Sequence, residues 1–179
     1  KQRLTSLPEL FAYRMVAFNV GERGHVERTY GQFVSGSYFS ALGLSPALAR
    51  FLRPVDTATA GGEPVVIVSY DYWHTRFNGS PEVLGRTIRV NELPLTVIGV
   101  APPGFQGTVL MLKCDLWAPA TLAPTLLAGS RELDDRSLRG YSVAGALARS
   151  STPAQSQAEL DRTMSELAKA YPETNANVR

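Results

Sequence analysis

The feature of this chain that most constrains its fold is a run of short elements between residues 32 and 105. Apart from a linking segment, the run reads QFVSGSYFSALGLSPALAR and then PVVIVSYDYWHTRFNGSPEVLGRTIRVNELPLTVIGVAPPGF. Short β-branched segments alternate here with brief helical patterns and turn residues. None of these pieces contains a reactive group, so the run describes a scaffold and not a catalytic site.

The first part of the run predicts a short strand at 32–35 and a helical turn, capped by Ser37, that stops at Gly43. Residues 65–68 form an apolar β-branched segment typical of a buried strand. A short helix should follow, because Ser69 can cap its first turn and an Asn-Gly pair breaks its end.

The second part of the run predicts a β-hairpin. Residues 87–90 and 95–100 alternate with period two around the segment 91–94. A two-residue type I′ turn requires positive φ at both central positions, which glycine adopts freely and Glu92 does not. Because Pro94 follows closely, we expect a longer loop at this point, with a bulge.

The segments outside the run predict three further strands and the start of a helix. Residues 15–20 and 26–35 read as strands joined across the turn 21–24. Residues 141–148 alternate weakly and predict another strand. Before them all, residues 6–9 carry a Ser and a Glu at capping-box spacing, which predicts the start of a helix.

The clearest single element is a helix near the C-terminus. Thr152 is its predicted N-cap, Pro153 occupies the first helical position, Gln155 completes a capping box, and Pro172 ends the helix. The helix carries an apolar stripe, which we expect to pack against a sheet, with a partner-docking face as the alternative. The stripe contains Leu160, Met164, Leu167, Ala168 and Tyr171.

Length and composition favour a soluble globular domain. A chain of 179 residues buries roughly 70% of its unfolded surface, which is enough for a substantial core. Its 44% hydrophobic and 19% charged content is ordinary for folded proteins. The net charge of +2 comes from 18 basic and 16 acidic side chains without a basic run, so we expect no nucleic-acid partner.

Cysteine content and hydropathy exclude two further features. Cys114 is the single cysteine, so an internal disulfide is impossible, and a small core hydrophobe is its simplest role. No apolar stretch approaches 18 residues, which excludes a membrane span within the chain. The chain begins at Lys1 and lacks the pattern of a signal peptide, so we expect a fragment of a longer protein.

The sequence contains no convincing catalytic motif. A P-loop is excluded, because no lysine follows a glycine. The segment 140–144 approaches a Gly-x-Ser-x-Gly elbow around Ser142, but it ends in alanine inside a predicted strand. His25 and His74 lie far apart in sequence, without further ligands at metal-binding spacing. We therefore expect no enzyme activity, no cofactor and no metal site.

Four segments of the chain resemble the periplasmic core domain of MacB-type ABC transporter permeases, the macrolide-export and lipoprotein-release type of permease. They occur in the right order at residues 34–50, 65–105, 115–119 and 148–175. Two departures stand out. The hairpin of that family usually turns on Asn-Gly, whereas Glu92 follows Asn91 here. The first strand-helix block of the family commonly ends in Gly-Arg, and this chain has Ala49 before Arg50.

The resemblance implies an α+β fold with two subdomains. A porter-like subdomain would combine both ends of the chain, residues 1–52 and 121–179. A smaller, β-rich and sabre-like subdomain, residues 53–120, would be inserted between them.

The resemblance also implies a function. The chain would be a non-catalytic, extracytoplasmic domain of a permease in a bacterial inner membrane, transmitting conformational change and contacting an adaptor or exported cargo. Its implied partners are flanking transmembrane helices, a separate ATPase subunit and a second permease in a dimer; a lipoprotein-releasing role is a close variant. The alternative is a periplasmic ligand-sensing or solute-binding module that uses a cleft between the lobes.

One loop is the candidate contact surface for a partner, because function on a rigid scaffold concentrates in loops. Residues 101–112 follow a Pro-Pro-Gly breaker and carry Phe105, Gln106, Leu110 and Met111, which we predict to contact an adaptor or cargo. The alternative is that the three apolar residues among them close the core over the hairpin.

Overall fold

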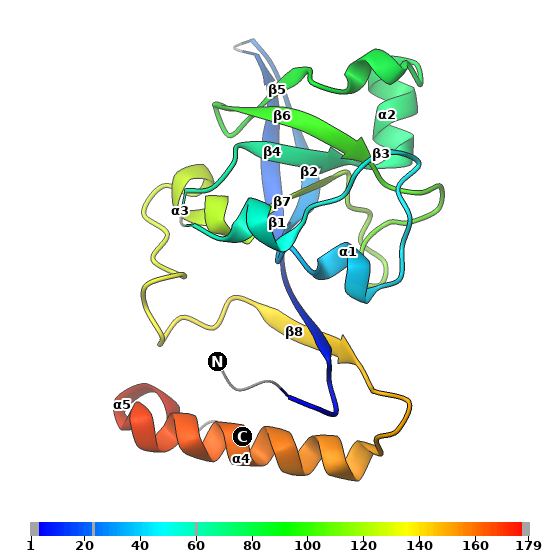
Figure 1. The fold of residues 1–179 in the computed structure, drawn as a ribbon. Helices are drawn as coiled ribbons and strands as arrows, with labels where there is room; N and C mark the ends of the chain where they lie inside the picture. The colour runs from blue at the N-terminus through cyan, green and yellow to red at the C-terminus, as the bar shows by residue number, and fades with distance from the viewer. Residues whose placement is uncertain (1–3, 23, 60, 177–179) are drawn as a thin grey trace.

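The computed structural model describes residues 4–22, 24–59 and 61–176 as a mixture of helices and strands around a sheet-rich core (Figure 1). This mixture agrees with the predicted α+β class. Arg23, in the predicted turn at 21–24, lies outside the described residues. The strands are β1 (Glu9–Glu22), β2 (His25–Val34), β3 (Leu48–Ala49), β4 (Val65–Val68), β5 (Thr87–Val90), β6 (Leu93–Val100), β7 (Leu116–Pro119) and β8 (Ser142–Ala146).

The helices are short except for one. The α-helices are α1 (Tyr38–Ala41), α2 (Tyr70–Phe77), α3 (Ala123–Leu126), α4 (Pro153–Ala170) and α5 (Pro172–Asn175), and the 3₁₀ helices are η1 (Pro54–Thr57), η2 (Pro81–Val83) and η3 (Ala120–Leu122). None of the helices in the described ranges is both long and apolar enough to cross a membrane.

The sheet closes on itself. Its strands follow the order β2-β7-β4-β6-β5-β1-β8, and β1 also pairs with β2 along ten residue pairs. Because β1 therefore touches both β2 and β5, six strands form a closed barrel. β3 pairs with the last two residues of β6, and β8 pairs with the first five residues of β1.

The closure between β1 and β5 is narrow. The two strands pair at a single residue pair, Val20 with Val90. Beside it, the Asn91 N–H donates to the Asn19 carbonyl at 2.7 Å. The side chain of Asn91 extends this contact, because its Oδ1 accepts from the Asn19 N–H at 2.8 Å and its Nδ2 donates to the Leu126 carbonyl of α3 at 2.9 Å. One asparagine thus joins β1, the β5–β6 turn and α3.

The core has two parts, one on each side of β4 and β7. β4 is buried along its whole length, as its sequence predicts, and its side chains alternate between the two parts. Val66 and Val68 face the barrel interior with Phe18 and Phe33. Ile67 faces the outer cluster beneath α1, where aromatic side chains gather. That cluster includes Phe11, Tyr38, Phe39, Phe105 and Trp117.

The prediction of a longer loop with a bulge between β5 and β6 is wrong. Val90 pairs with Leu93, so the turn has only two residues, and both have positive φ, 47° at Asn91 and 69° at Glu92. This is the type I′ geometry that suits the twist of a hairpin. Glu92 therefore accepts a left-handed conformation that glycine would adopt without cost.

The second departure from the family pattern also falls on a left-handed residue. Ala49 has φ of 57° at the end of β3, where it pairs with Gly99 of β6. A glycine would adopt this conformation without strain, whereas the Cβ of Ala49 disfavours positive φ.

The predicted helix at residues 6–9 is absent, because Glu9 instead opens β1. Ser6 is buried and faces α4, where its N–H and Oγ both donate to the Glu159 carboxylate at 3.0 and 2.6 Å. Ser156 donates to the Ser6 Oγ at 2.8 Å, and the Ala148 N–H donates to the Ser6 carbonyl at 2.9 Å. Ser6 thus bonds to residues of α4 some 150 positions away in the sequence and does not cap a local helix. Local spacing could not reveal these contacts.

The helix α4 begins as predicted. Thr152 caps it and Gln155 completes the capping box. With β8 and the start of β1, α4 forms a small layer below the barrel (Figure 1). The expected packing of its apolar stripe is incomplete, because Leu160, Met164 and Leu167 are only half-buried.

The division into residues 1–52 with 121–179 and residues 53–120 stays a prediction. Strand pairing joins the two proposed subdomains, because β2 and β1 of residues 1–52 pair with β7 and β5 of residues 53–120.

We expect Glu92→Gly to raise the free energy of unfolding by about 1 kcal/mol, because it removes the cost of a left-handed glutamate. Urea titration measures the change. Glu92→Ala is the matched control and should show no such gain, since alanine is equally strained at φ of 69°. Equal effects of the two substitutions would contradict the argument from backbone strain.

Candidate partner-binding loop

The candidate loop joins β6 to β7 and is fastened at its base. The Ala101 N–H donates to the Val68 carbonyl at 2.9 Å where the loop begins. Where it ends, the Cys114 N–H donates to the Gln106 carbonyl at 3.0 Å, and the Asp115 N–H donates to the Tyr30 carbonyl at 2.8 Å. The loop therefore leaves and rejoins the barrel through main-chain bonds.

Phe105 belongs to the outer part of the core and is not a projecting residue. Its ring stacks on Trp117 with centroids 5.3 Å apart and lies 6.2 Å from the Phe39 ring. For this residue the structure matches the alternative, in which the side chain closes the core. Gln106 is exposed, and its carbonyl accepts the bond from Cys114.

The tip of the loop is apolar and exposed. Leu110 is 92% exposed, Met111 is fully exposed, and Leu112 follows at 39%. Three successive apolar residues at a surface are unusual unless they meet a partner. The structure thus separates the four predicted contact residues: Leu110 and Met111 project, Gln106 lies at the surface of the base, and Phe105 packs inward.

A buried polar cluster lies beneath the loop. Gln32 of β2 is fully buried, and its Oε1 accepts from the Tyr38 hydroxyl at 2.7 Å and from the Trp117 indole N–H at 2.9 Å. Its Nε2 donates to the Thr108 hydroxyl of the loop at 3.2 Å, and that hydroxyl also lies 3.2 Å from the Tyr38 hydroxyl. Burial raises the pKa of Tyr38 to about 12, so its hydroxyl stays protonated as a donor.

The far side of the loop is held by charge and by a buried thiol. The Lys113 ammonium lies 2.9 Å from the Asp71 carboxylate of α2, and this hydrogen bond raises the pKa of Lys113. Burial, with a smaller effect of Asp115, raises the pKa of Cys114 to about 12. The thiol is therefore a neutral core group, as predicted, and lies 3.6 Å from the Met15 sulfur.

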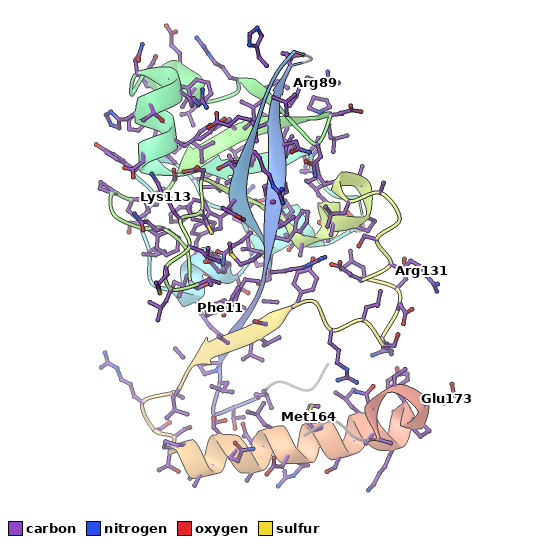
Figure 2. The ribbon with its side chains drawn as sticks, turned by 180° about the vertical axis from the view of Figure 1, so that it is seen from behind. Phe11, Arg89, Lys113, Arg131, Met164 and Glu173 are labelled. Atoms are coloured by element: carbon purple, nitrogen blue, oxygen red, sulfur yellow. The ribbon has the colours of Figure 1, made fainter. Side chains whose placement is uncertain are left out.

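The loop lies on the flank of the barrel. Lys113 marks its end between α2 and the layer of β8 and α4, whereas Arg89 lies at the end of the molecule farthest from α4 (Figure 2).

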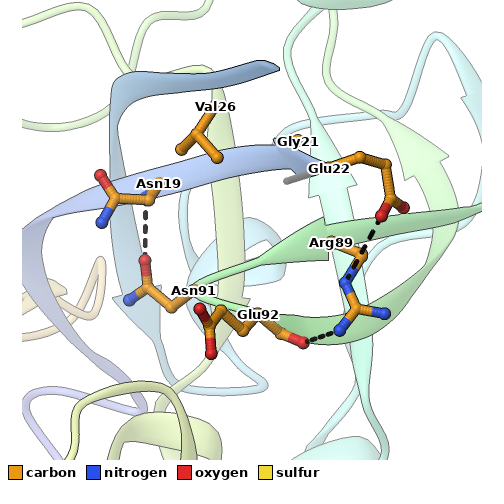
Figure 3. A pocket seen from close by; sticks show the side chains of 7 residues that line it. All are labelled: Asn19, Gly21, Glu22, Val26, Arg89, Asn91 and Glu92. Carbon is orange, nitrogen blue, oxygen red and sulfur yellow. Dashed lines mark hydrogen bonds and ion pairs between the residues drawn. The ribbon is translucent and has the colours of Figure 1, made fainter. Parts of the chain in front are cut away.

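A separate cavity of about 530 Å³ opens at the far end (Figure 3). Gly21 and Val26 of the β1–β2 hairpin face the β5–β6 turn across it. The Arg89 guanidinium is already engaged, since it donates to the Glu92 carbonyl at 2.8 Å and lies 3.9 Å from the Glu22 carboxylate. The lining residues are Asn19, Gly21, Glu22, Val26, Arg89, Asn91 and Glu92.

The residues considered for catalysis do not assemble into a site. Ser142 opens β8 and pairs with Tyr13, so it lies within a strand and not at the strand-to-helix turn that a nucleophile elbow requires. In the described ranges, His, Cys, Asp and Glu side chains do not gather in threes as metal ligands.

Comparison with known proteins decides the family. A sequence profile of the MacB-like periplasmic core domain matches residues 5–163. The chain belongs to this family. MacB-like core domains are extracytoplasmic parts of ABC transporter permeases and are generally non-catalytic, which agrees with the predicted class of protein and implies an extracytoplasmic location.

Solved structures share the fold. The periplasmic region of MacB from Actinobacillus actinomycetemcomitans has a TM-score of 0.68 at 15% identity, over 98% of this chain and 72% of that one. The extracellular domain of the noncanonic ABC-type transporter YknZ from Gram-positive bacteria has a TM-score of 0.67 at 15% identity, over 97% of this chain and 81% of that one.

One curated relative is closer in sequence over a shorter stretch. A Pseudomonas fluorescens (strain Pf0-1) protein named Probable export ATP-binding/permease protein is 33% identical over 75 residues. The match spans 42% of this chain and 12% of the relative. The match thus covers a small part of that protein.

Alanine substitutions in the loop should distinguish the core residue from the tip residues by their effect on the free energy of unfolding. We expect Phe105→Ala to lower the free energy of unfolding by about 2 kcal/mol or more, because it empties a space beside Trp117. Leu110→Ala and Met111→Ala should each change it by less than about 0.5 kcal/mol, because neither side chain packs on the barrel. Chemical denaturation of the three variants provides the test, and a large loss at Met111 would place the tip in the core.

Proposed function

We propose that this MacB-like domain transmits motion from the membrane to the outside and contacts a protein partner through the tip formed by Leu110, Met111 and Leu112. The partner class that fits best is an extracytoplasmic adaptor with an apolar pocket. Exported cargo is the alternative partner. The exposed apolar tip on a fastened base is the observation that carries this proposal.

The tip suits a protein pocket because of its size and composition. Methionine and leucine side chains supply apolar area that gains free energy when it leaves water. Their projection beyond the surface fits a concave partner, while Lys113 beside them remains paired with Asp71 and leaves the tip uncharged.

Strand β1 is the element that would transmit motion. Its 14 residues extend about 45 Å at the usual rise of a strand, and they run from the layer of β8 and α4 to the far end of the barrel. Because β1 pairs with β8, β2 and β5, a displacement of its start reaches every part of the sheet.

The segment before β1 is coupled to α4 through Ser6. The hydrogen bonds of Ser6 to Glu159 and Ser156 tie the entry of the chain to the helix, and its carbonyl is tied to the end of β8. A pull on this segment would therefore move α4, β8 and β1 as one unit.

The proposed setting is a permease in a bacterial inner membrane. Transmembrane helices would connect to the domain, a separate ATPase subunit would drive them, and two permeases would act as a dimer. The inserted lobe at residues 53–120 would contribute the tip, and the ends of the chain would face the membrane.

The solute-binding alternative has less support. Ligand pockets are mostly apolar, with a few well-placed polar groups. The cavity at the far end has only Val26 as an apolar wall, and its one arginine is already engaged by Glu22 and Glu92.

The contact can be tested by complementation. In a strain that lacks the permease, we expect the full-length protein with Leu110→Ser and Met111→Ser to fail to restore the deletion phenotype, while the variant protein is made at normal levels. Val55→Ser is a matched control, because Val55 is 66% exposed on η1 and is not part of the tip. Full complementation by the tip variant would exclude the proposed contact.

The coupling through Ser6 can be tested by titration. Hydrogen bonds from Ser6, with further bonds from Thr5, lower the pKa of Glu159 from 4.5 to about 2. The stabilisation from these bonds is therefore complete above pH 4.5 and disappears as the pH falls through 2. We expect Ser6→Ala to move the Glu159 midpoint toward 4.5 in carboxyl-resolved NMR, and an unchanged midpoint would show that Ser6 does not hold α4.

A further inference from the structure

We infer that Gln32 and Thr108 are positioning residues that hold the loop tip in one conformation. The inference concerns how the loop is ordered, and only its use in partner binding rests on the proposed function. Its basis is the polar cluster beneath the loop, which joins four separate elements inside the outer core.

Gln32 is the centre of this cluster because three of its hydrogen bonds are satisfied inside the protein. The bonds from Tyr38 of α1 and Trp117 of β7 occupy its Oε1. Both donors belong to the fixed core, and both side chains are fully buried. The orientation of the Gln32 amide is therefore set before the loop is considered.

Thr108 is the one member of the cluster that comes from the loop. With Oε1 of Gln32 committed to the core donors, Nε2 points to the Thr108 hydroxyl at 3.2 Å. If the loop moved away, this amide would lose its partner inside the core, and an unsatisfied buried donor is costly. The amide thus favours the conformation in which Thr108 lies against it.

Gly107 shows how closely the loop passes over the cluster. A Cβ built on Gly107 would lie 2.9 Å from the Cys114 sulfur and 3.1 Å from the Gln32 Oε1. Its φ of 99° also favours glycine. The main chain therefore lies directly on the cluster, three residues before the exposed tip begins at Leu110.

Ordering at Thr108 bears directly on binding. A tip that is already fixed loses less conformational entropy when a partner binds it. The Gln32 cluster and the salt bridge from Lys113 to Asp71 hold the two sides of the tip, so Leu110 and Met111 project from a short segment with both ends fastened.

The experiment compares Thr108→Val with Thr108→Ser in the 179-residue chain. Valine keeps the shape of threonine and removes the hydroxyl, whereas serine keeps the hydroxyl. We expect Thr108→Val to raise amide hydrogen exchange in residues 109–114 about tenfold, and Thr108→Ser to stay within about twofold of the original chain. The amides of β4 and β6 serve as the internal reference and should keep their protection.

Two results would overturn the inference. Equal exchange in the valine and serine variants would show that the hydroxyl does not order the loop. Loss of protection in β4 and β6 together with the loop would show that Thr108 supports the whole fold and not the tip.

Complementation then separates this inference from the proposed function. If Thr108→Val loosens the loop and the full-length variant still restores the deletion phenotype, the ordering role stands and the need for an ordered tip in function fails. If both loosening and loss of complementation occur, with Thr108→Ser normal in both, the two proposals are supported together.

Discussion

The barrel depends on the closure between β1 and β5, which consists of one residue pair and the contacts of one asparagine side chain. Val20 and Val90 make the pair, and Asn91 supplies through its amide the contacts that a longer ladder would make with main-chain groups. Without this closure the sheet would have two open edges, and the interior around Phe18 and Phe33 would meet water along the gap. Asn91 has a positive φ, and its side-chain amide bonds to both β1 and α3.

The same strand that closes the barrel also enters the lower layer. β1 gives its first residues to β8 and its last to β5, so the two ends of the molecule share one continuous piece of backbone. The loop before β7 is connected to β1 through β2, because Gln32 of β2 donates a hydrogen bond to Thr108 of the loop and β2 pairs with β1. In this MacB-like domain, the layer of β8 and α4, the barrel and the apolar tip are therefore connected by strand pairing and by buried polar bonds.

Features set by local chemistry were predictable from the sequence. The cap and capping box of α4 and the buried strand β4 each follow from a few adjacent residues, and the structure has both. Family resemblance supplied the class of protein, and its two departures, at Ala49 and Glu92, both proved to be left-handed residues.

Features set by distant contacts were not predictable in this way. Ser6 and Glu9 have the spacing of a helix start, but Ser6 bonds to Glu159, and nothing near Ser6 in the sequence shows this. Phe105 and Met111 lie in the same apolar loop, and only the position of Trp117 in space separates a core residue from an exposed one. Thr108 likewise gained its role from Gln32, which is 76 residues away.

The turn at Asn91 and Glu92 also bears on how the protein ages. Asparagine deamidates when the following main-chain nitrogen attacks its side-chain carbonyl, and a small following residue such as glycine leaves that attack unhindered. Glutamate hinders it, and the Asn91 amide is further held by Asn19 and Leu126. Conversion to aspartate would replace the Nδ2 donor with an acceptor facing the Leu126 carbonyl. Backbone strain at residue 92 is therefore accompanied by chemical durability of the asparagine that closes the barrel.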